Sequence, residues 1–363
     1  MKIALWIIEI IALVIMAVML FLYINPVFGG RISKNEKKDY ITRAGNYIKG
    51  RFTYPKEYEL EGESTDNRVS NKGKSPKSVL PSVKPIINND ISKSELMVTW
   101  FGHSTVFIQM NGMNILIDPV FSKRPSPISF IGPKRFSEPP ITIDELPPID
   151  IVIVSHDHYD HLDMKSIKKL DKKVKKYIVP LGVDKNLKRW NIDAGKIKNM
   201  AWWEEVEVEG LMIACTPVRH FSNRQVFDMA STLYASWVLK DENHQIYESG
   251  DGGFGKHFNE IHKRYGVFDF VMMECGQYNM RWHDIHMFPE ESSKAANMLG
   301  AKISMPIHWG TFVLSNHGWD DSVERFVTAS EKMGTEVITP KIGETVCLDK
   351  YKNYKNRWWR EIE

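Results

Sequence analysis

The sequence predicts an α/β (α+β) protein built as a sheet-on-sheet sandwich with helices outside, joined to an N-terminal transmembrane helix. Short apolar runs of β type first follow one another as a meander and later alternate with helical patterns. The 363 residues are 43% hydrophobic and 26% charged, an ordinary globular composition that excludes wholesale disorder. A long apolar segment at the N-terminus predicts the membrane-spanning element.

The N-terminal apolar segment covers Ile3–Ile24 and is interrupted only by Glu9. As a helix of 22 residues it would be about 33 Å long, which is enough to cross the hydrocarbon core of a bilayer. Trp6 and Tyr23 fit the interfacial positions near its two ends. Pro26 then predicts the end of the helix.

A cleaved signal peptide is the main alternative to a retained anchor. The apolar core of a signal peptide is normally about 7–15 residues long and is followed by small residues at the cleavage site. Here the apolar run is longer, and Pro26–Gly30 is a poor cleavage site. A buried core helix is disfavoured because the segment is apolar on all sides. We therefore expect an uncleaved anchor.

Basic residues follow this anchor. Residues 31–95 contain 14 Lys and Arg against 9 Asp and Glu, whereas Lys2 stands alone before the helix. The positive-inside rule then predicts a single-pass protein of the cell membrane with its catalytic domain in the cytoplasm. The 3 cysteines have no CxxC spacing, which excludes a disulfide framework and agrees with a reducing compartment. The net charge of +3 is too balanced to indicate a nucleic-acid partner.

We expect three segments along the chain: a transmembrane anchor over 1–30, a basic juxtamembrane arm over 31–95, and one large domain over 96–363. The arm is polar, with little hydrophobic periodicity. Within it, only Asn46-Tyr47 and Gly50–Phe52 look suited to packing on another surface. We therefore predict that the arm is mainly a linker between the membrane and the domain.

The large domain begins with a β-meander. The turn sequence Asn111-Gly112 separates two apolar runs and predicts a tight hairpin. Pro289 followed by two glutamates is typical of a helix start. The predicted strands lie at 96–101, 105–110, 114–117, 150–155, 177–180, 211–216, 232–239, 245–249, 268–273, 302–306 and 336–338, and the predicted helices at 163–175, 289–299 and 320–333.

The strongest chemical signal directly follows the apolar run 150–155. The segment His156–His161 holds three histidines and two aspartates, which is too dense for core residues or for a chance surface loop. Imidazole and carboxylate together suit zinc and tolerate iron or manganese. His220, Asp251 and His308 each follow another apolar run. Alone, each would more often be structural, but their repeated placement after β-type runs favours a shared metal site.

With these residues in this order, residues 96 to 349 resemble the metallo-β-lactamase fold superfamily. The resemblance implies a four-layer αββα sandwich with a dinuclear site for two Zn2+, with Mn2+ or Fe2+ as alternatives. It also implies that Asp118 braces the metal loop rather than binding metal. By the same resemblance, His156, His158 and His220 hold one metal, Asp160, His161 and His308 hold the other, and Asp251 bridges both.

A narrower resemblance points to the branch that contains N-acyl phosphatidylethanolamine-hydrolysing phospholipase D. It rests on the motifs at 99–105, 216–222, 286–291 and 308–312, and on 25–30, which is similar to the start of bacterial, membrane-anchored members. The sequence departs from this branch in three places, one of which is Ser222-Asn223-Arg224 instead of a Ser-Gly-Arg pattern. Gly252-Gly253-Phe254 replaces a Thr-Gly-Tyr pattern, and Arg219 replaces a glutamine. We expect these departures to affect the specificity for the lipid head group and not the binding of the metals.

The resemblance implies a mechanism in which two metals share one water and lower its pKa, so that a hydroxide forms near neutral pH. Asp160 and Asp251 would hold that hydroxide. His286 is the candidate proton donor or phosphate contact, with helix capping as the alternative role. His103 either lines the site or only locks the first hairpin. The remaining candidate substrate contacts are Tyr278, Arg281 and Arg219.

The predicted function is therefore a metal-dependent phosphodiesterase of phospholipase D type that acts on membrane phospholipids such as N-acyl phosphatidylethanolamine. A hydrolase of small soluble substrates, such as a lactone or a cyclic or sugar phosphate, is the alternative on the same site. A non-enzymatic membrane scaffold is disfavoured by the intact ligand positions. The basic aromatic tail 354–360 either docks on anionic lipid or packs on the domain. The expected partners are a phosphodiester substrate and the bilayer, and a homodimer is left open.

Overall fold

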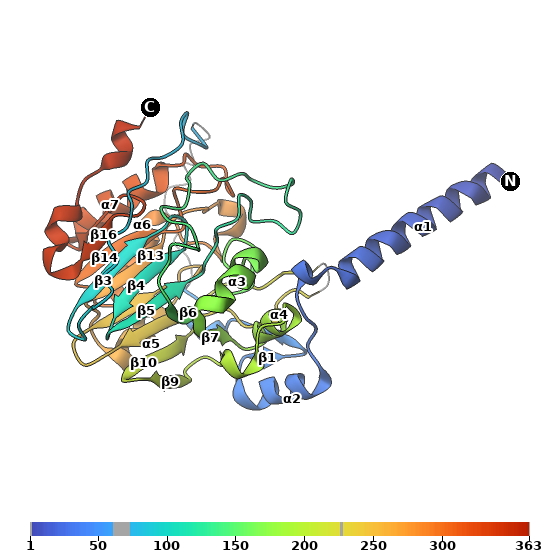
Figure 1. Ribbon diagram of the computed structural model, residues 1–363, viewed down its shortest axis with the longest axis horizontal. Helices are drawn as coiled ribbons and strands as arrows, with labels where there is room; N and C mark the ends of the chain where they lie inside the picture. The colour runs from blue at the N-terminus through green and yellow to red at the C-terminus, as the bar shows by residue number, and fades with distance from the viewer. Residues whose placement is uncertain (1, 61–72, 226–227, 363) are drawn as a thin grey trace.

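The computed structural model describes residues 2–60, 73–225 and 228–362. Residues 61–72 of the predicted arm lie outside these ranges. The described residues form a globular body of two packed sheets flanked by helices, from which one long N-terminal helix projects (Figure 1).

The two large sheets repeat one pattern of strand pairing. Each has seven strands, of which the first four in spatial order pair antiparallel and the remainder pair parallel. The first sheet has the order β16 (Thr345–Cys347), β3 (Leu96–Trp100), β4 (Val106–Met110), β5 (Met113–Ile117), β6 (Ile149–Ile153), β7 (Val174–Pro180) and β8 (Ile197–Met200). The second has the order β9 (Glu205–Val208), β10 (Leu211–Thr216), β11 (Ser236–Lys240), β12 (Gln245–Glu248), β13 (Phe270–Glu274), β14 (Ile303–Ile307) and β15 (Glu336–Val337).

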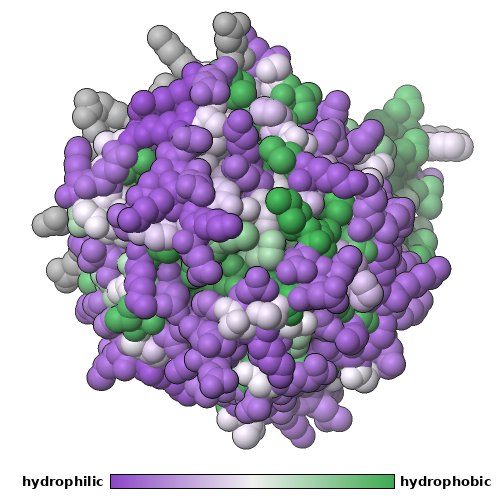
Figure 2. Space-filling view, turned by 60° about the vertical axis from the view of Figure 1, so that its left-hand side comes forward, coloured by the Kyte–Doolittle hydropathy of each residue, from purple (hydrophilic) through white to green (hydrophobic). Residues whose placement is uncertain are grey.

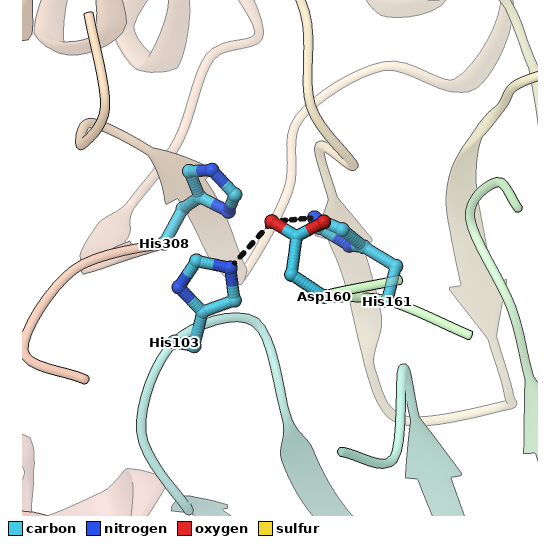
Figure 3. A group of neighbouring side chains, drawn as sticks. All are labelled: His103, Asp160, His161 and His308. Atoms are coloured by element: carbon cyan, nitrogen blue, oxygen red, sulfur yellow. Dashed lines mark hydrogen bonds and ion pairs between the residues drawn. The ribbon is translucent and has the colours of Figure 1, made fainter. Parts of the chain in front are cut away.

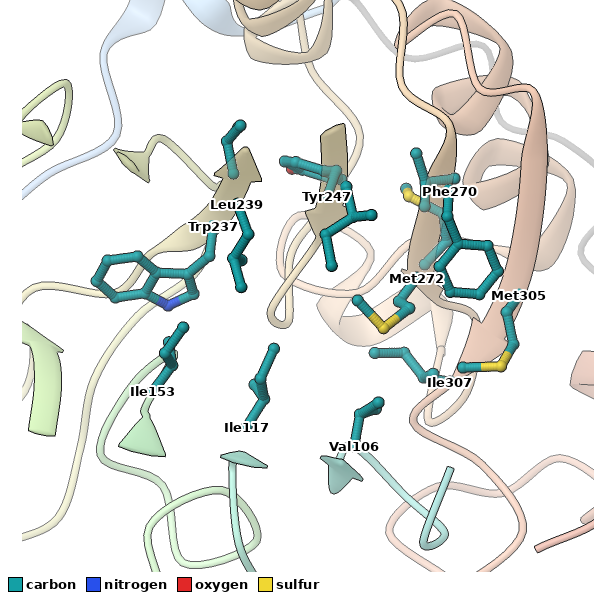
Figure 4. Packing of buried hydrophobic residues seen from close by; sticks show 14 of the residues in the cluster. Val106, Ile117, Ile153, Trp237, Leu239, Tyr247, Phe270, Met272, Met305 and Ile307 are labelled. Carbon is teal, nitrogen blue, oxygen red and sulfur yellow. The ribbon is translucent and has the colours of Figure 1, made fainter. Parts of the chain in front are cut away.

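The main hydrophobic core lies between the two sheets. Strands such as β4 and β13 are buried along their whole length, because both faces of each sheet are covered. Ile117 and Ile153 of the first sheet face Trp237 of the second (Figure 4). A separate core covers the outer face of the first sheet, where Leu116 and Val152 pack with helical residues.

Helices cover the outer faces and complete the αββα layering. α3 and α4 contribute to the core outside the first sheet, while α5, α6 and α7 pack on the second. The four-layer metallo-β-lactamase fold implied by the sequence is therefore confirmed. The helices of the body are α3 (Met164–Leu170), α4 (Asp184–Arg189), α5 (His257–Tyr265), α6 (Pro289–Met298) and α7 (Asp321–Met333).

The N-terminal helix α1 (Lys2–Ile24) stands away from the body and is long and apolar enough to cross a membrane. A signal sequence would satisfy the same criteria of length and composition. In the space-filling view its hydrophobic surface contrasts with the mainly hydrophilic body (Figure 2). Asn25 caps the short 3-10 helix η1 (Pro26–Phe28), and the chain then enters the body.

The arm after the anchor folds onto the body over part of its length. α2 (Lys34–Arg43) begins with a capping box and is followed by the small hairpin of β1 (Tyr47–Ile48) and β2 (Arg51–Phe52). Tyr47 and Phe52 are buried, as expected from the sequence, and pack with Tyr40. Arg43 pairs with Glu204 of the body at 2.7 Å. This stretch, expected to be mainly a linker, is anchored at least at these contacts.

Several predicted elements differ from the structure. The helix predicted over 163–175 ends at Leu170, and β7 already begins at Val174. The strand predicted over 232–239 is shifted, because β11 begins at Ser236. The sequence patterns also did not predict the helices α2, α4 and α5 or the strands β8, β9 and β16. β8, β9 and β16 are edge strands, whose short length and mixed polarity give no clear apolar run.

The C-terminal tail packs on the body, which is the second of the two interpretations of residues 354–360. Trp358 and Trp359 are 2% and 1% exposed and join the main core beside Trp309. Arg357 pairs with Glu324 of α7 at 2.5 Å. The aromatic side chains that could have entered a bilayer are therefore already buried in protein.

Candidate metal centre

The histidine and aspartate candidates converge at one edge of the sandwich. His156 follows β6, His220 follows β10, Asp251 follows β12 and His308 follows β14. β6 and β14 each run parallel to a neighbouring strand, so their carboxyl ends lie at a common edge of their sheets. The site is therefore assembled from loops that are distant in sequence but held by rigid strands.

The first cluster consists of His156, His158 and His220, whose facing nitrogen atoms all lie within 4.8 Å of one another. His158 Nδ1 lies 2.9 Å from His156 Nε2 and 3.3 Å from His220 Nε2. Tetrahedral zinc with metal–nitrogen bonds near 2.0 Å would separate its ligand nitrogens by about 3.3 Å. The three imidazoles therefore have close to the spacing that one metal ion requires.

The second cluster consists of His103, Asp160, His161 and His308 (Figure 3). Asp160 Oδ2 lies 2.9 Å from His103 Nε2 and 3.6 Å from His161 Nε2. Asp160 is the most exposed member, with 14% of its side chain accessible, whereas the histidines are nearly fully buried. This cluster combines imidazoles with a carboxylate at the mouth of the site.

Asp251 lies between the two clusters. Its Oδ2 is 2.9 Å from His161 Nε2 and 3.9 Å from His156 Nε2. Its Oδ1 is 3.0 Å from His308 Nδ1. A single buried carboxylate thus contacts residues of both clusters, which is the placement that a bridging ligand needs.

The burial of the donors fits a metal site. His161 Nε2 and Asp251 Oδ1 are buried and lie within 3.0 Å of Asp251 Oδ2 and His308 Nδ1, respectively, but neither contact has the alignment of a hydrogen bond within the described residues. Unsatisfied buried polar atoms are costly, and a bound cation would satisfy both. The imidazole and carboxylate donors suit Zn2+ and also accommodate Mn2+ or Fe2+. The residues present therefore fit a dinuclear metal centre without specifying the metal.

The protonation states also favour metal binding. Burial and neighbouring histidines hold the pKa values of His156 and His220 well below the usual range, so both imidazoles are neutral at pH 7. Burial raises the pKa of Asp251, but His161 and His308 outweigh it and keep that pKa low. Burial lowers the pKa of His161, but Asp251, Asp160 and Asp118 raise it well above its ordinary value. Most donors are therefore already in the form that binds cations.

Asp118 and Ser155 form a bracing network beneath the metal loop. Asp118 Oδ2 accepts from His161 Nδ1 at 2.7 Å, and its Oδ1 accepts from the Ser155 backbone at 2.7 Å. The Ser155 hydroxyl also reaches His156 Nδ1 at 2.9 Å. Such contacts orient the imidazole rings so that their outer nitrogens face the centre.

Three residues at or next to the second cluster have strained backbone conformations. His103, Asp118 and His308 adopt φ values of 53°, 42° and 65°, in the left-handed region that L-residues rarely occupy. The backbone N–H of His308 donates to the carbonyl of His103 at 2.8 Å, which joins the two loops. Strain of this kind persists where the surrounding structure enforces it, as at functional sites.

His286 lies beside both clusters. Its ring is nearly parallel to that of His308, with centroids 5.4 Å apart, and 12% of its side chain is exposed. His286 Nδ1 lies 3.5 Å from Glu274 Oε2, a fully buried carboxylate at the end of β13. Burial lowers the pKa of His286, but Glu274 and Asp251 outweigh this and raise it. Burial raises the pKa of Glu274 to about 7.

The remaining substrate candidates are not gathered at the centre. The Tyr278 hydroxyl donates to Asp321, and its ring stacks on His317 at 4.2 Å. Arg219 pairs with Asp284 at 2.8 Å, and Arg281 is exposed on a short 3-10 helix. Among the four candidates, only His103 joins the metal-capable donors.

Two buried residues of the site were not found from the sequence. Glu274 and Glu248 end the strands β13 and β12, at the same edge as the ligands. Burial raises the pKa of Glu248 well above its usual range, and its Oε1 accepts from the Gly250 backbone at 2.9 Å. An acidic residue at the end of an apolar run was a usable signal, because a strand interior rarely ends on a buried carboxylate without a partner.

Comparison with known proteins agrees with this geometry. Residues 113–309 match the model of the β-lactamase superfamily domain. An uncharacterised protein of Mycobacterium tuberculosis is 38% identical over 290 residues, which cover 78% of this chain and 77% of that protein. N-acyl-phosphatidylethanolamine-hydrolyzing phospholipase D 1 of Caenorhabditis elegans is 34% identical over 292 residues, covering 74% and 82%.

Solved structures support the same fold. The metallo-β-lactamase fold protein YhfI of Bacillus subtilis superimposes with a TM-score of 0.50 at 15% sequence identity, covering 70% of this chain and 99% of that one. The family match and the buried His and Asp clusters lead to one conclusion. The chain belongs to the metallo-β-lactamase superfamily, as a metal-dependent hydrolase with a buried His/Asp metal site.

Proposed function

We propose that this protein is a phosphodiesterase of phospholipase D type that cleaves membrane phospholipids such as N-acyl phosphatidylethanolamine. The observation that carries the proposal is the combination of two donor clusters on one bridging carboxylate with an apolar helix at the N-terminus of the same chain. The similarity to the nematode N-acyl-phosphatidylethanolamine-hydrolyzing phospholipase D supports the choice of substrate.

Two divalent cations at this site would supply a water of lowered pKa and a Lewis acid for the phosphoryl oxygens. In the proposal His156, His158 and His220 hold one cation, Asp160, His161 and His308 the other, and Asp251 contacts both. His103 stays in the proposal as a substrate contact or a further donor, because its Nε2 lies 2.9 Å from Asp160.

The chain itself would orient the reacting groups. Asp160 at the mouth and Asp251 at the base would accept hydrogen bonds from the attacking water and aim it at phosphorus. His286 would donate a proton to the oxygen of the leaving head group. Glu274 faces His286 Nδ1, so the other ring nitrogen, Nε2, is available to the substrate. In this arrangement Glu274 would fix the orientation of the His286 ring, and His286 would act as the general acid.

The location follows from the same proposal. With α1 retained as a single-pass anchor, the body would lie on the side of the membrane that carries the basic residues after the helix, which is the cytoplasmic side. Tethering keeps a hydrolase close to a substrate that is itself confined to the bilayer. Arg219 and Arg281 are proposed as outer contacts for phosphate, although Arg219 would first have to release Asp284.

A lipid digest tests the proposal. Full-length protein loaded with zinc would be incubated with total bacterial membrane lipid and with N-acyl phosphatidylethanolamine, and the products read by mass spectrometry. The expected products are phosphatidic acid and the released head-group alcohol, including N-acylethanolamine. Asp251→Asn provides the inactive control, because it removes the carboxylate that contacts both clusters.

Other outcomes redirect the assignment. Diacylglycerol would retain the lipid substrate but place the cleavage on the other side of phosphorus. Unchanged lipids, with both metals shown to be bound, would contradict the phospholipase proposal. They would favour a hydrolase of lactones or of cyclic or sugar phosphates, which should then be assayed on the same preparation.

A further inference from the structure

The base of α1 is seated firmly in the body. Arg224 Nε donates to the carbonyl of Val27 at 2.9 Å, and the Gly30 backbone N–H donates to Asn186 Oδ1 at 3.1 Å. A Cβ on Gly30 would lie only 2.2 Å from the Lys185 carbonyl, so the chain fits closely there. The point at which the anchor leaves the body is therefore fixed.

The same arginine reaches the metal loop. Arg224 is fully buried, and its Nη1 donates to the carbonyls of Asp157 and Leu162 at 2.8 Å each. Its guanidinium also lies over the ring of Tyr159. The exit of the anchor and the loop that carries the first donor cluster thus share one buried side chain.

The loop between β5 and β6 projects on the side of the body from which α1 leaves (Figure 1). Its tip carries Phe130 and Ile131, which are 78% and 53% exposed. The tip is not loose: the Ile131 backbone N–H donates to the Ile128 carbonyl at 3.1 Å, and Arg124 donates to the Gly132 carbonyl. An ordered loop thus holds two large apolar side chains in solvent, at a cost that an interaction partner would remove.

Basic residues flank this apolar tip in the sequence. Lys123, Arg124 and Lys134 lie on the loop, and the sequence has no acidic residue from 121 to 137. Ser122, Lys123 and Ser129 of the loop line a cleft of about 540 Å³ together with Asn25, which directly follows α1, and with Asp163. The basic loop is therefore continuous with the exit of the apolar helix.

We propose that the loop Phe121–Arg135 is a second membrane contact, which inserts Phe130 and Ile131 into the interface of an anionic bilayer beside α1. Lys123 and Lys134 would then meet lipid phosphates. Apolar insertion with flanking basic residues is the usual combination at interfacial protein segments. Two contacts on one face would stop the body from rotating about the anchor and would keep the metal loop at the bilayer.

The bilayer is favoured over a second copy of the chain for two reasons. The loop adjoins a helix that is itself long and apolar enough to span a membrane. The loop itself carries basic residues and no acidic ones, so its net positive charge suits anionic head groups, whereas the same loop of a second copy would repel it. The proposal rests on the membrane location within the proposed function but not on the identity of the substrate.

Depth-dependent fluorescence quenching tests the proposal. Cys215 and Cys275 are buried, so a Cys347→Ser background permits labelling at single added cysteines. Phe130→Cys, labelled with an environment-sensitive fluorophore, would be studied in full-length protein in nanodiscs of phosphatidylcholine with phosphatidylglycerol. We expect a blue-shifted emission that lipids carrying a doxyl group quench. Lys123→Glu with Lys134→Glu should reduce both effects.

Two further labels give the matched controls. The first control is Ile86, which is 69% exposed and whose backbone is held to Thr345 of the edge strand β16 by hydrogen bonds. A label there should remain unquenched. Leu13 of α1 is 59% exposed, and a label there should be quenched strongly. If the labels at positions 130 and 86 were equally exposed to water while the label at position 13 was quenched, the proposal for the loop would be wrong, but the membrane location would stand.

The remaining outcomes are also decisive. An unquenched label at position 13 would remove the bilayer as a partner and would contradict the membrane location as well. A blue shift at position 130 that doxyl lipids do not quench, and that disappears on dilution of the protein, would overturn the proposal in favour of contact between copies. No readout depends on turnover, so failure of the phospholipase assignment is recognised separately by the lipid digest.

Discussion

The first donor cluster contains only imidazoles, whereas the second combines imidazoles with carboxylates. In the first cluster, burial and neighbouring histidines outweigh the charge of Asp251, whose Oδ2 lies 3.9 Å from His156 Nε2, so His156 and His220 are neutral. In the second cluster, His161 contacts both Asp118 and Asp251, so it carries a proton near neutral pH before any metal binds. One cluster is thus preformed for a cation, and the other is stabilised by an internal ion pair.

The difference indicates how the two halves of the site depend on each other. Asp251 connects the two clusters, because it contacts His161 and His308 and approaches His156. A metal in the first cluster can bind without displacing a proton, while a metal in the second must displace the proton of His161. Substitutions at single residues test this difference between the clusters.

The largest effect is expected from Asp251→Asn. Loss of the carboxylate charge removes the group shared by both clusters, so both should lose metal, and hydrolysis should fall by roughly 10³-fold. Elemental analysis after gel filtration measures the metal content. The exposed Asp349→Asn serves as the matched control. Retention of two metals per chain by the Asp251 variant would show that it does not bridge the clusters.

Asp118→Asn should separate the clusters. Asp118 accepts the Nδ1–H of His161, so the change weakens the orientation and basicity of a second-cluster donor. We expect a loss of about 10–100-fold in metal affinity at the second cluster and a smaller loss at the first. Competition titration with a chelator would resolve two affinities. An equal loss at both would contradict the distinction drawn between them.

The pH dependence of metal affinity should also differ between the clusters. Since the carboxylates raise the pKa of His161, metal affinity at the second cluster should fall with decreasing pH by about tenfold per unit below that pKa. The lowered pKa values of His156 and His220 predict a nearly flat profile at the first cluster between pH 8 and 6.

Titrations at pH 6, 7 and 8 would measure each profile on its own. His308→Ala isolates the first cluster and His220→Ala isolates the second. The same slope in both variants would show that the His161 ion pair does not govern metal binding.

The smallest effect concerns a histidine outside both clusters. His317 accepts from the Gln277 N–H at 2.7 Å and donates to the Gly318 carbonyl, and burial lowers its pKa to about 4. Because the unfolded state takes up the proton first, stability is complete above pH 6.5 and falls as the pH approaches 4. At pH 5.5 the loss should be about 1.4 kcal/mol.

Urea unfolding at pH 7 and 5.5 measures this contribution. His317→Asn should reduce the difference in unfolding free energy between the two pH values, although it lowers stability at pH 7. An unchanged difference would show that the acid sensitivity arises from the metal site alone.

Much of the fold could be predicted because its central strands are buried on both faces. β4, β6 and β13 appear in the sequence as continuous apolar runs, and the turn Asn111-Gly112 adopts the two positive φ values that its sequence predicts. The edge strands could not be predicted in the same way. β9, with the sequence Glu-Val-Glu-Val, is only half-buried, and its assignment depends on a partner strand that the local sequence does not reveal.

The donor residues were visible in the sequence because their type and their position after strands follow local rules. Their placement after strands favoured a shared site, and the family resemblance implied how the ligands divide between two metals, but the geometry depends on the sheet order, which brings together loops as far apart in sequence as those of His103 and His308. His103 shows the limit of such reasoning. It was expected as a substrate contact or a hairpin lock, and the structure places it 2.9 Å from Asp160.

The apolar N-terminal helix, most of the buried strands and the metal-capable residues could be recognised from the sequence, because hydrophobic periodicity and side-chain chemistry are local properties. Three features required the three-dimensional structure: His103 joins the second cluster, Glu274 faces His286, and the C-terminal tryptophans are buried. The structure also placed the loop that carries Phe130 beside the exit of α1. Distances between remote loops depend on the packing of two whole sheets, which no single segment encodes.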